Sequence, residues 1–363
     1  MNLTPLPAGA PYRETELFRK KKSFVGLDLG NRSLKAVEIT MEGSEAVITG
    51  FSRLEMQPGS DRAEALGALL NAGSFSSRQV VSSVAGQAVV VRYINMVRMS
   101  DAELRQAIYF ESDKYLPYDI DEVVLDCQRL EHSVAAEGQA SGDDNMSVVL
   151  VACQKGIVTR LLDEIAEHGL TPTAVDVDVF ALANAWEMSG EAESSSDAID
   201  VATALVDVGA SRTQINVMRG GETCFSREIG MGGNDMTKAI ARRMSLDLDG
   251  AEAIKREPGE REVEVARAIN PVLEDLVSEL SLSLDFVENR EGVRVEEVLL
   301  SGGGALAPGA MESVSQGTGR PARNWNPLSG LHVDSDRVDV DELEANAATL
   351  AIAVGLAARV KAA

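Results

Sequence analysis

The chain has 363 residues, of which 45% are hydrophobic and 4% aromatic, so it can bury a sizeable core and is expected to divide into two or three lobes. Its formal charge of −23 disfavours non-specific binding to nucleic acid or anionic lipid, because both would repel it. The cysteines Cys127, Cys153 and Cys224 are far apart and form no CxxC pair. We interpret them as reduced, buried residues and not as metal ligands or a disulfide.

The first 22 residues are rich in proline and then in basic residues, which predicts a flexible arm. They contain no apolar segment typical of a secretory signal. The apolar run Ala347–Val360 is too short to cross a bilayer. A cytoplasmic protein with no direct membrane insertion is therefore expected.

The segment Phe24–Ile48 predicts strands joined near residues 41–45, and it is interrupted by Asp28, Gly30 and Lys35. Such a tight turn between strands lets backbone N–H groups converge on phosphate oxygens, and glycine permits the close approach. An aspartate beside a polyphosphate needs a divalent cation between them, whereas a lysine can reach the phosphate directly.

A helix is predicted after Ser100, which forms a capping box with Glu103. Leu104 and Ile108 have the spacing of a core-facing stripe. The aromatic residues that follow exceed what one such stripe requires, in a chain otherwise poor in aromatics; they are Tyr109, Phe110, Tyr115 and Tyr118. A long polar loop is predicted at residues 135–147 and a linker at residues 189–200.

The segment Ala202–Phe225 repeats the earlier pattern: an apolar strand, Asp207, Gly209, a second strand, a turn at residues 220–221 and a third strand. Two Asp-x-Gly turns, one in each half of the chain, predict a Mg²⁺–nucleotide cleft with Asp28 and Asp207 on the metal side. Taken singly, each turn is more typical of an ordinary loop, because Asp-x-Gly is common in turns.

A third glycine-rich element lies in residues 295–314, where an apolar strand ends at Leu300 and a helix is predicted after Pro308. Between them, Gly302, Gly303 and Gly304 offer bare backbone on which a flat ring or a phosphate can lie. The alternative is a turn that packs a strand closely against a helix. The acidic stretch at residues 334–344 predicts a solvated loop, with a docking surface as the alternative.

Two Asp-x-Gly hairpins and a triple-glycine turn in this order resemble the phosphate-1, phosphate-2 and adenosine motifs of the actin/Hsp70/sugar-kinase superfamily. From about Ser23 to its end, the chain is most similar within that superfamily to the PilM family of type IV pilus assembly proteins, which are FtsA-like. The resemblance implies an α/β, actin-like ATPase fold of two lobes around a nucleotide cleft. The segments that carry it are "GLDLGNRSLKAVEI", "AIYFESDKYLPYDIDEVVLDCQRL", "AVDVDVFALANA", "ALVDVGASRTQINV", "EVLLSGGGALAPG", "NWNPL" and "LAIAVGLAAR".

The resemblance also implies a division of the chain. The expected parts are the arm (1–22), a first lobe (23–190) with an inserted peptide-binding subdomain at about 92–147, a linker (191–199), a second lobe (200–344) and a C-terminal helix that returns to the first lobe (345–363).

Site residues follow from the same resemblance. ATP and Mg²⁺ are the implied cofactors. The residues implied are Asp28, Gly30 and Asn31 for the first phosphate loop with Lys35 on the β-phosphate, Asp207, Gly209, Ala210 and Ser211 for the second loop, and Gly302, Gly303, Gly304, Glu252 and Lys255 around adenine and ribose.

Asp178 falls where catalytic relatives place a glutamate beside the attacking water. Aspartate is one methylene shorter, so slow or absent hydrolysis is expected. The alternative is that Asp178 is the N-cap of the helix formed by the apolar run that follows it.

In the PilM family the small subdomain binds the cytoplasmic tail of a PilN-like inner-membrane protein, which implies a peptide groove lined or supported by Tyr109, Tyr115, Leu116 and Tyr118. The arm itself resembles such a tail, so it is predicted either to inhibit the groove in cis or to link subunits by self-association. The alternative is an extended tail with chance similarity. The arm residues concerned are Asn2, Leu3, Pro5, Tyr12, Arg13 and Glu14.

The implied function is a nucleotide-gated cytoplasmic scaffold, peripheral at the inner membrane through its partner, that transmits to pilus motor components. One alternative is a GspL-like component of a type II secretion system. The other is a small-molecule kinase of the same superfamily, which would need a substrate pocket and a second well-placed carboxylate.

Overall fold

The computed structural model describes residues 22–57, 59–130, 145–194 and 200–361. The predicted arm, apart from Lys22, most of the polar loop at 135–147 and the end of the predicted linker therefore lie outside the described residues.

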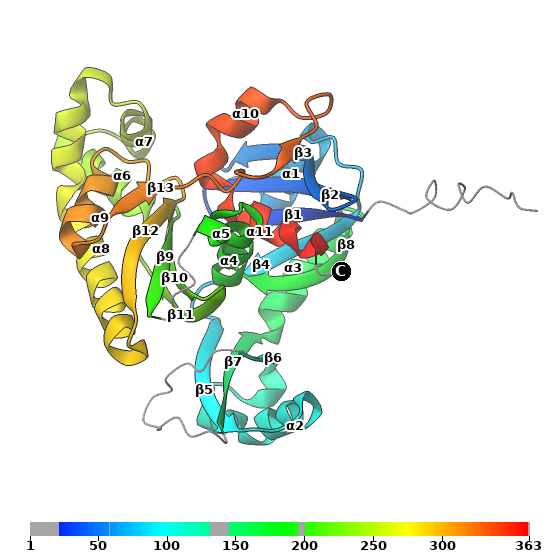
Figure 1. Ribbon diagram of the computed structural model, residues 1–363. Helices are drawn as coiled ribbons and strands as arrows, with labels where there is room; N and C mark the ends of the chain where they lie inside the picture. The colour runs from blue at the N-terminus through cyan, green and yellow to red at the C-terminus, as the bar shows by residue number, and fades with distance from the viewer. Residues whose placement is uncertain (1–21, 58, 131–144, 195–199, 362–363) are drawn as a thin grey trace, which may run out of the picture.

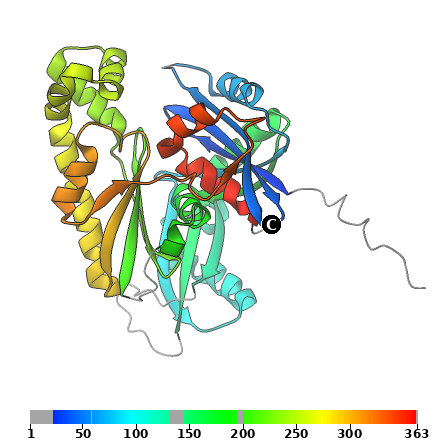
Figure 2. The same ribbon diagram turned by 45° about the horizontal axis from the view of Figure 1, so that its top comes forward.

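The first lobe is built on a mixed six-stranded sheet in the order β14-β3-β2-β1-β4-β8 (Figures 1 and 2). Helices cover both of its faces, which explains why β1 is buried along nearly its whole length. Gly26 shows how closely one cover lies, since a Cβ there would approach the Ala353 carbonyl oxygen to 2.0 Å. The strands are β1 (Ser23–Leu29), β2 (Ser33–Glu42), β3 (Glu45–Glu55), β4 (Gln79–Val84), β8 (Thr171–Val177) and β14 (His332–Val333), and the covering helices are α1 (Arg62–Ala72) and α3 (Lys155–Glu167) on one face and α4 (Asp178–Met188) and α11 (Ala351–Ala357) on the other.

The second lobe is built on a five-stranded sheet in the order β11-β10-β9-β12-β13. Its helices pack on one face, while the other face lies against α4, where the Asn216 side-chain amide donates to the Val179 carbonyl at 2.6 Å. Helix α4 thus lies between the two sheets. The elements are β9 (Val201–Val208), β10 (Thr213–Arg219), β11 (Glu222–Ile229), β12 (Arg294–Ser301), β13 (Ala322–Asn324), α6 (Gly233–Met244), α7 (Leu248–Arg256), α8 (Glu262–Glu291) and α9 (Ala310–Thr318).

A small subdomain projects from the first lobe (Figure 1). Its antiparallel sheet, in the order β5-β7-β6, packs against α2 (Asp101–Glu111). The predicted capping box of Ser100 and Glu103 is confirmed at the start of α2. The subdomain extends beyond the predicted residues 92–147 at both ends. Its strand β5 (Val89–Val97) follows β4 after a short turn, and β7 (Asn145–Gln154) runs directly into α3. The third strand is β6 (Val123–Arg129).

The chain returns to the first lobe earlier than the predicted residue 345. Strand β14 pairs with β3, and Trp325, Leu328 and Leu343 are buried in the core of the first lobe. Because these apolar side chains are buried there, the second lobe ends before residue 325 and not at residue 344. The acidic stretch at 334–344, predicted as a loop, ends within α10 (Val340–Ala345).

The predicted linker begins with a short helix, α5 (Glu191–Ser194), and Arg323 pairs with Glu191 at 2.7 Å. All three cysteines are free; two are buried, and Cys127 is half-buried, in contrast to the prediction. The remaining elements are the 3-10 helices η1 (Ser112–Lys114), η2 (Ile120–Glu122), η3 (Gly259–Arg261), η4 (Ala347–Thr349) and η5 (Ala358–Lys361).

Candidate functional site

A cavity of about 810 Å³ lies between the two lobes. It is lined by the β1–β2, β9–β10 and β12–α9 turns and by α7. Every residue predicted to hold nucleotide or metal lines this one cavity, although the residues come from distant parts of the chain. They are Asp28, Gly30, Asn31, Lys35, Asp178, Asp207, Gly209, Ala210, Ser211, Glu252, Lys255, Gly302, Gly303 and Gly304.

The first hairpin holds an ion pair at the cavity. Asp28 and Lys35 are direct cross-strand partners, and the Lys35 Nζ donates to the Asp28 Oδ2 at 2.7 Å. A Cβ at Gly30 would lie 2.8 Å from the Ser33 carbonyl oxygen, so the tightness of this turn requires glycine. Lys35 is therefore held in place by Asp28, with its ammonium at the cavity wall.

The second hairpin is tied to the first and to the triple-glycine turn. The Ser301 hydroxyl donates to the Asp207 Oδ1 at 2.8 Å. The Asn31 side-chain amide donates to the Ser211 hydroxyl at 2.9 Å, which joins the two turns across the cleft. Burial is the main cause that raises the pKa of Asp207, and the charge of Lys35 opposes it.

Asp178 is the first residue of α4, and its Oδ1 accepts a hydrogen bond from the Ser83 hydroxyl at 2.6 Å. The N-cap alternative was wrong, because Val177 holds that position and no side chain caps the helix. Burial, with the negative charges of Asp28 and Asp207, raises the pKa of Asp178 to about 7. The carboxylates of Asp28, Asp178 and Asp207 thus line the same cavity and act on one another through their charge.

The packing alternative for the triple-glycine turn is confirmed at two of its three glycines. Gly302 has a φ of +86°, and a Cβ there would lie 2.4 Å from the Val208 carbonyl oxygen, while one at Gly304 would lie 2.5 Å from the Val208 Cγ1. These two glycines are required by packing against the second hairpin. A Cβ at Gly303 would meet nothing closer than 4.0 Å, so this residue presents open backbone to the cavity.

Glu252 and Lys255 of α7 form a closed polar cluster at the cavity wall. The Lys255 Nζ donates to the Glu252 Oε2 at 2.7 Å, to the Thr237 hydroxyl at 2.8 Å and to the Gly233 carbonyl at 3.0 Å. Burial acts to raise the pKa of Glu252, but the hydrogen bonds from Lys255 and Thr237 outweigh it and lower the pKa to about 2. All three ammonium protons of Lys255 have acceptors, so Lys255 and Glu252 form a fixed part of the cavity wall.

Arginines that the sequence prediction did not include also line the cavity. Arg256 donates to Glu252 at 2.9 Å and also pairs with Glu55 of β3, and so connects the two lobes. Arg212 directly follows the predicted second phosphate loop, a signal that the sequence contained. Arg256 likewise directly follows the predicted Lys255, but the sequence held no signal for its pairing with Glu55, which is separated from it by 201 positions.

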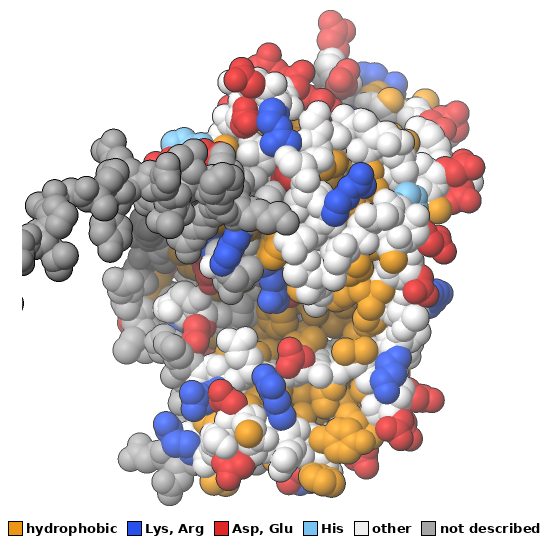
Figure 3. Space-filling view, turned by 90° about the vertical axis from the view of Figure 1, so that its right-hand side faces the viewer, with side chains coloured by type: hydrophobic (Ala, Val, Ile, Leu, Met, Phe, Trp, Pro, Cys, Tyr) orange, Lys and Arg blue, Asp and Glu red, His pale blue; other side chains and the backbone are white. Residues whose placement is uncertain are grey.

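The predicted peptide-binding residues fall into two groups. Tyr109 is 53% exposed, whereas Leu116 is buried and Tyr115 and Tyr118 pack partly against the core of the small subdomain. Phe110, which was not among the predicted groove residues, is 83% exposed and contacts Tyr109 edge to face with ring centroids 5.9 Å apart. Figure 3 shows hydrophobic side chains gathered over this part of the molecule and around a hollow above it.

Neither a metal-binding cluster of side chains nor a membrane-spanning helix is found in the described residues. Within them, no group of three or more histidine, cysteine, aspartate or glutamate side chains is arranged to hold a metal ion on its own. No helix in the described part of the chain has the length and apolar character needed to span a bilayer.

Comparison with known proteins identifies relatives over nearly the whole chain. The family model described as type IV pilus assembly protein PilM matches residues 26–361. A solved PilM–PilN type IV pilus biogenesis complex contains a chain that is 28% identical, with a TM-score of 0.79, covering 93% of this chain and 98% of that one. The ethanolamine utilization protein EutJ from Carboxydothermus hydrogenoformans has a TM-score of 0.51 at 15% identity over 98% of this chain and 91% of that one, which shows similarity of fold alone.

Curated relatives match a shorter segment. EutJ of Escherichia coli K12 is 28% identical over 108 residues, which are 30% of this chain and 36% of that protein. The cell division protein FtsA of Bacillus subtilis is 28% identical over 110 residues, which are 30% of this chain and 23% of that protein. The predicted α/β fold of the actin/Hsp70/FtsA type is confirmed by the matches that extend over nearly the whole chain.

Proposed function

The chain belongs to the family of the type IV pilus assembly protein PilM, and from this premise we propose that it is an ATP-binding scaffold that binds the cytoplasmic tail of a PilN-like inner-membrane protein. The observation that carries the proposal is the single cavity in which three glycine-rich turns from two lobes meet. The partner is proposed because a chain of the PilM–PilN complex matches 93% of this one.

The side chains around the cavity fit Mg·ATP. Asp178 and Asp207 are half-buried with raised pKa values, and each accepts one side-chain hydrogen bond. Carboxylates left in this state favour a divalent cation. Asp28 and Asp207 would hold Mg²⁺ through water, which agrees with the lack of an all-protein metal cage in the described residues.

Phosphates would be held by the backbone of the two hairpin turns and by Lys35, and the purine and ribose by Gly303 and the wall formed by Glu252 and Lys255. Bound Mg²⁺ supplies charge neutralisation to the phosphates. On nucleotide binding, Lys35 would exchange its ion pair with Asp28 for a contact with phosphate, which carries a higher negative charge.

Asp178 is proposed to orient water at the terminal phosphate. With a pKa of about 7, its carboxyl is only partly ionised near neutral pH, and it is a weak base in that state. Slow or absent hydrolysis agrees with a scaffold whose nucleotide state changes rarely. ATP hydrolysis measured as released phosphate tests this role.

The peptide surface is proposed to centre on Tyr109 and Phe110 of α2. Both are exposed aromatic side chains that already contact each other, so their ordering on binding has little entropic cost. Tyr115, Leu116 and Tyr118 would support this surface from beneath. Recruitment by the partner would bring the protein to the inner membrane, and contact with motor components remains a prediction.

The type II secretion and kinase alternatives are not favoured, because the PilM model spans residues 26–361. The hypothesis that the N-terminal arm occupies a groove lies outside the described residues and stays a prediction. A truncation that starts at Lys22 tests it: unchanged affinity for the tail peptide and unchanged self-association would contradict it.

The proposal is tested by calorimetric titration of nucleotide-free protein with Mg·ATP. Micromolar-range binding is expected in the wild type, with a loss of at least about tenfold in Lys35→Ala and Asp207→Ala, because each removes a charge from the phosphate and metal site. Lys238→Ala is the matched control, since this exposed lysine of α6 pairs with Asp235 and does not line the cavity between the lobes. A synthetic peptide of the tail of the organism's own PilN is titrated in parallel.

Wild-type protein that is folded and stripped of nucleotide but does not bind Mg·ATP would overturn the nucleotide site. Peptide binding without nucleotide binding would leave a peptide-binding scaffold. A change in ATP affinity when peptide is present would demonstrate coupling between the two sites.

A further inference from the structure

The second-lobe hairpin meets the entry to the small subdomain beside the cavity. Glu228 of β11 accepts hydrogen bonds through its Oε2 from the backbone N–H of Gly86 at 2.9 Å and from the Gln214 side chain at 2.8 Å. Gly86 lies in the turn between β4 and β5, so this carboxylate joins the second lobe to the strand that enters the small subdomain.

Arg212 is packed against the same turn. A Cβ at Gly86 would lie 3.0 Å from the Arg212 Nη1, and the φ of Gly86 is +92°. Both the backbone conformation and the contact with the guanidinium therefore favour glycine at this position. The Arg212 Nη1 lies 3.7 Å from the Glu228 Oε2, which is an ion pair at the long end of the range and longer than a charge-assisted hydrogen bond.

Arg212 also borders the nucleotide cavity. It directly follows Gly209–Ser211 of the second phosphate loop and lines the cavity with Asp178. Its positive charge acts to lower the pKa of Asp178, against the stronger effect of burial, which indicates that the guanidinium lies near that carboxyl. The guanidinium is about one-third exposed, and so it lies between a carboxylate on one side and the open cavity on the other.

The β4–β5 turn links this region to the aromatic surface. Ser83 donates to Asp178 at 2.6 Å, Gly86 donates to Glu228, and the Gln87 carbonyl accepts a hydrogen bond from the Tyr118 hydroxyl at 3.1 Å. Tyr118 in turn packs against the core that supports α2. One short segment thus contacts the proposed water-positioning residue, the second lobe and the base of the peptide surface.

We propose that Arg212 is a further nucleotide-binding residue, which contacts the terminal phosphate of ATP. When this phosphate is bound, Arg212 leaves Glu228 for it. The change at Glu228 is then transmitted to the small subdomain through Gly86 and Tyr118. The inference rests on the proposed nucleotide site. A phosphate dianion binds a guanidinium more strongly than a single carboxylate held at 3.7 Å does. ADP lacks the terminal phosphate, so it leaves Arg212 with Glu228.

The test compares Mg·ATP with Mg·ADP in two measurements. Calorimetry gives the ratio of the two affinities, and hydrogen exchange reports protection in β5, β6 and α2. In the wild type, ATP and ADP are expected to give different protection in these elements. Arg212→Ala is expected to lower ATP affinity about tenfold, to leave ADP affinity within about twofold and to abolish the difference in protection.

Two further variants sharpen the test. Glu228→Gln removes the competing charge but keeps an acceptor for Gly86, so ATP affinity is expected to rise a few-fold. Glu55→Gln is the matched control, because it removes the charge of another carboxylate that pairs across the lobes, with Arg256, and also pairs with Arg53. Its difference in protection between ATP and ADP is expected to remain.

The outcomes separate this inference from the proposed function. If the folded wild type does not bind ATP, the nucleotide site and this inference are both overturned. If it binds ATP but Arg212→Ala and Arg212→Lys keep the wild-type ratio of affinities, this inference alone is overturned. If Arg212→Ala loses the preference for ATP over ADP but keeps the wild-type difference in hydrogen-exchange protection between the two nucleotides, the proposed transmission to the small subdomain is overturned.

Discussion

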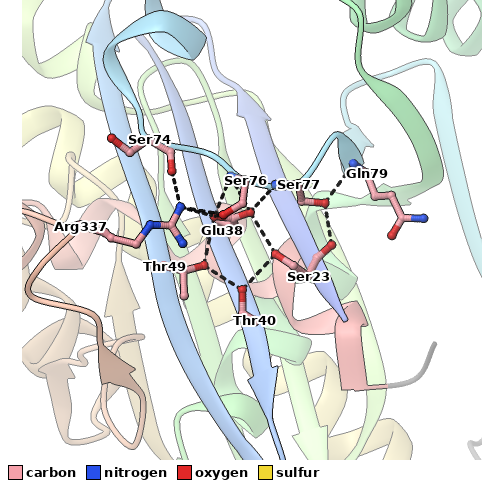
Figure 4. Close-up of polar contacts among 9 residues, drawn as sticks. All are labelled: Ser23, Glu38, Thr40, Thr49, Ser74, Ser76, Ser77, Gln79 and Arg337. Atoms are coloured by element: carbon pink, nitrogen blue, oxygen red, sulfur yellow. Dashed lines mark hydrogen bonds and ion pairs between the residues drawn. The ribbon is translucent and has the colours of Figure 1, made fainter. Parts of the chain in front are cut away.

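Glu38 of β2 is fully buried and Asp178 of α4 is half-buried, and the surroundings of these two carboxylates of the first lobe differ. Glu38 has no exposed surface and accepts hydrogen bonds from the side chains of Ser23 and Thr49 and from the backbone N–H groups of Ser76 and Ser77, at 2.6–3.2 Å. Arg337 adds its positive charge at 3.4 Å (Figure 4). Asp178 accepts one hydrogen bond, from Ser83, and faces two other carboxylates.

Glu38, whose oxygens are fully hydrogen-bonded, has a structural role, whereas Asp178 remains available to a ligand. The donors to Glu38 come from β1, β3, the segment after α1 and the segment before α10, so the carboxylate ties four parts of the chain together. A buried charge is stable only when it is paired and hydrogen-bonded. Asp178 has less of this compensation, and a bound cation would supply it.

The largest expected effect is on the structural side of this comparison. Glu38→Ala should lower the free energy of unfolding by about 3 kcal/mol, because Ser76, Ser77 and Arg337 lose their buried acceptor. Urea unfolding measures the loss, while ATP affinity of the folded protein should stay within about twofold. A loss below about 1 kcal/mol would remove the contrast between the two regions.

Removing the charge of Asp178 should raise the free energy of unfolding, in contrast to Glu38→Ala, and the size of the effect should depend on pH. Because folding raises the pKa of Asp178 to about 7, its protonated form favours the folded state. That contribution is fully present below the unfolded pKa of about 4 and is lost as the pH rises through 7.

Asp178→Asn removes this dependence. Without Mg²⁺ and with a chelator present, the variant should gain about 2 kcal/mol over the wild type between pH 5 and pH 8, measured by urea unfolding at each pH. An equal stability difference at both pH values would show that Asp178 is not strained by burial and neighbouring charge.

The smallest effect on stability is expected on the aromatic surface, which extends the comparison to apolar groups. Phe110→Ala should change the free energy of unfolding by less than about 0.5 kcal/mol, because this side chain is 83% exposed, yet weaken binding of the PilN tail peptide about tenfold.

Leu116→Ala is the matched variant in the same segment. Its side chain is buried in the core of the small subdomain, and its removal should cost about 2–3 kcal/mol of stability. Leu248→Ala, at an exposed leucine of the second lobe, controls for non-specific hydrophobic contact. Peptide affinity that is unchanged in Phe110→Ala would contradict the proposed surface.

Sequence alone determined the elements whose geometry is local. The two Asp-x-Gly hairpins, the triple-glycine turn and the capping box at Ser100 were predicted correctly, because glycine placement, capping and strand alternation act within a few residues. The pairing of Asp28 with Lys35 follows from the register of one hairpin.

Tertiary structure decided the contacts between segments far apart in the chain. Return of residues 325–343 to the first lobe, the link from Arg256 to Glu55, the contact of Arg212 with Gly86 and the complete enclosure of Glu38 depend on which faces pack together. No local pattern encodes such partners, because packing and compensation of buried charge are settled only when the sheets and helices come together.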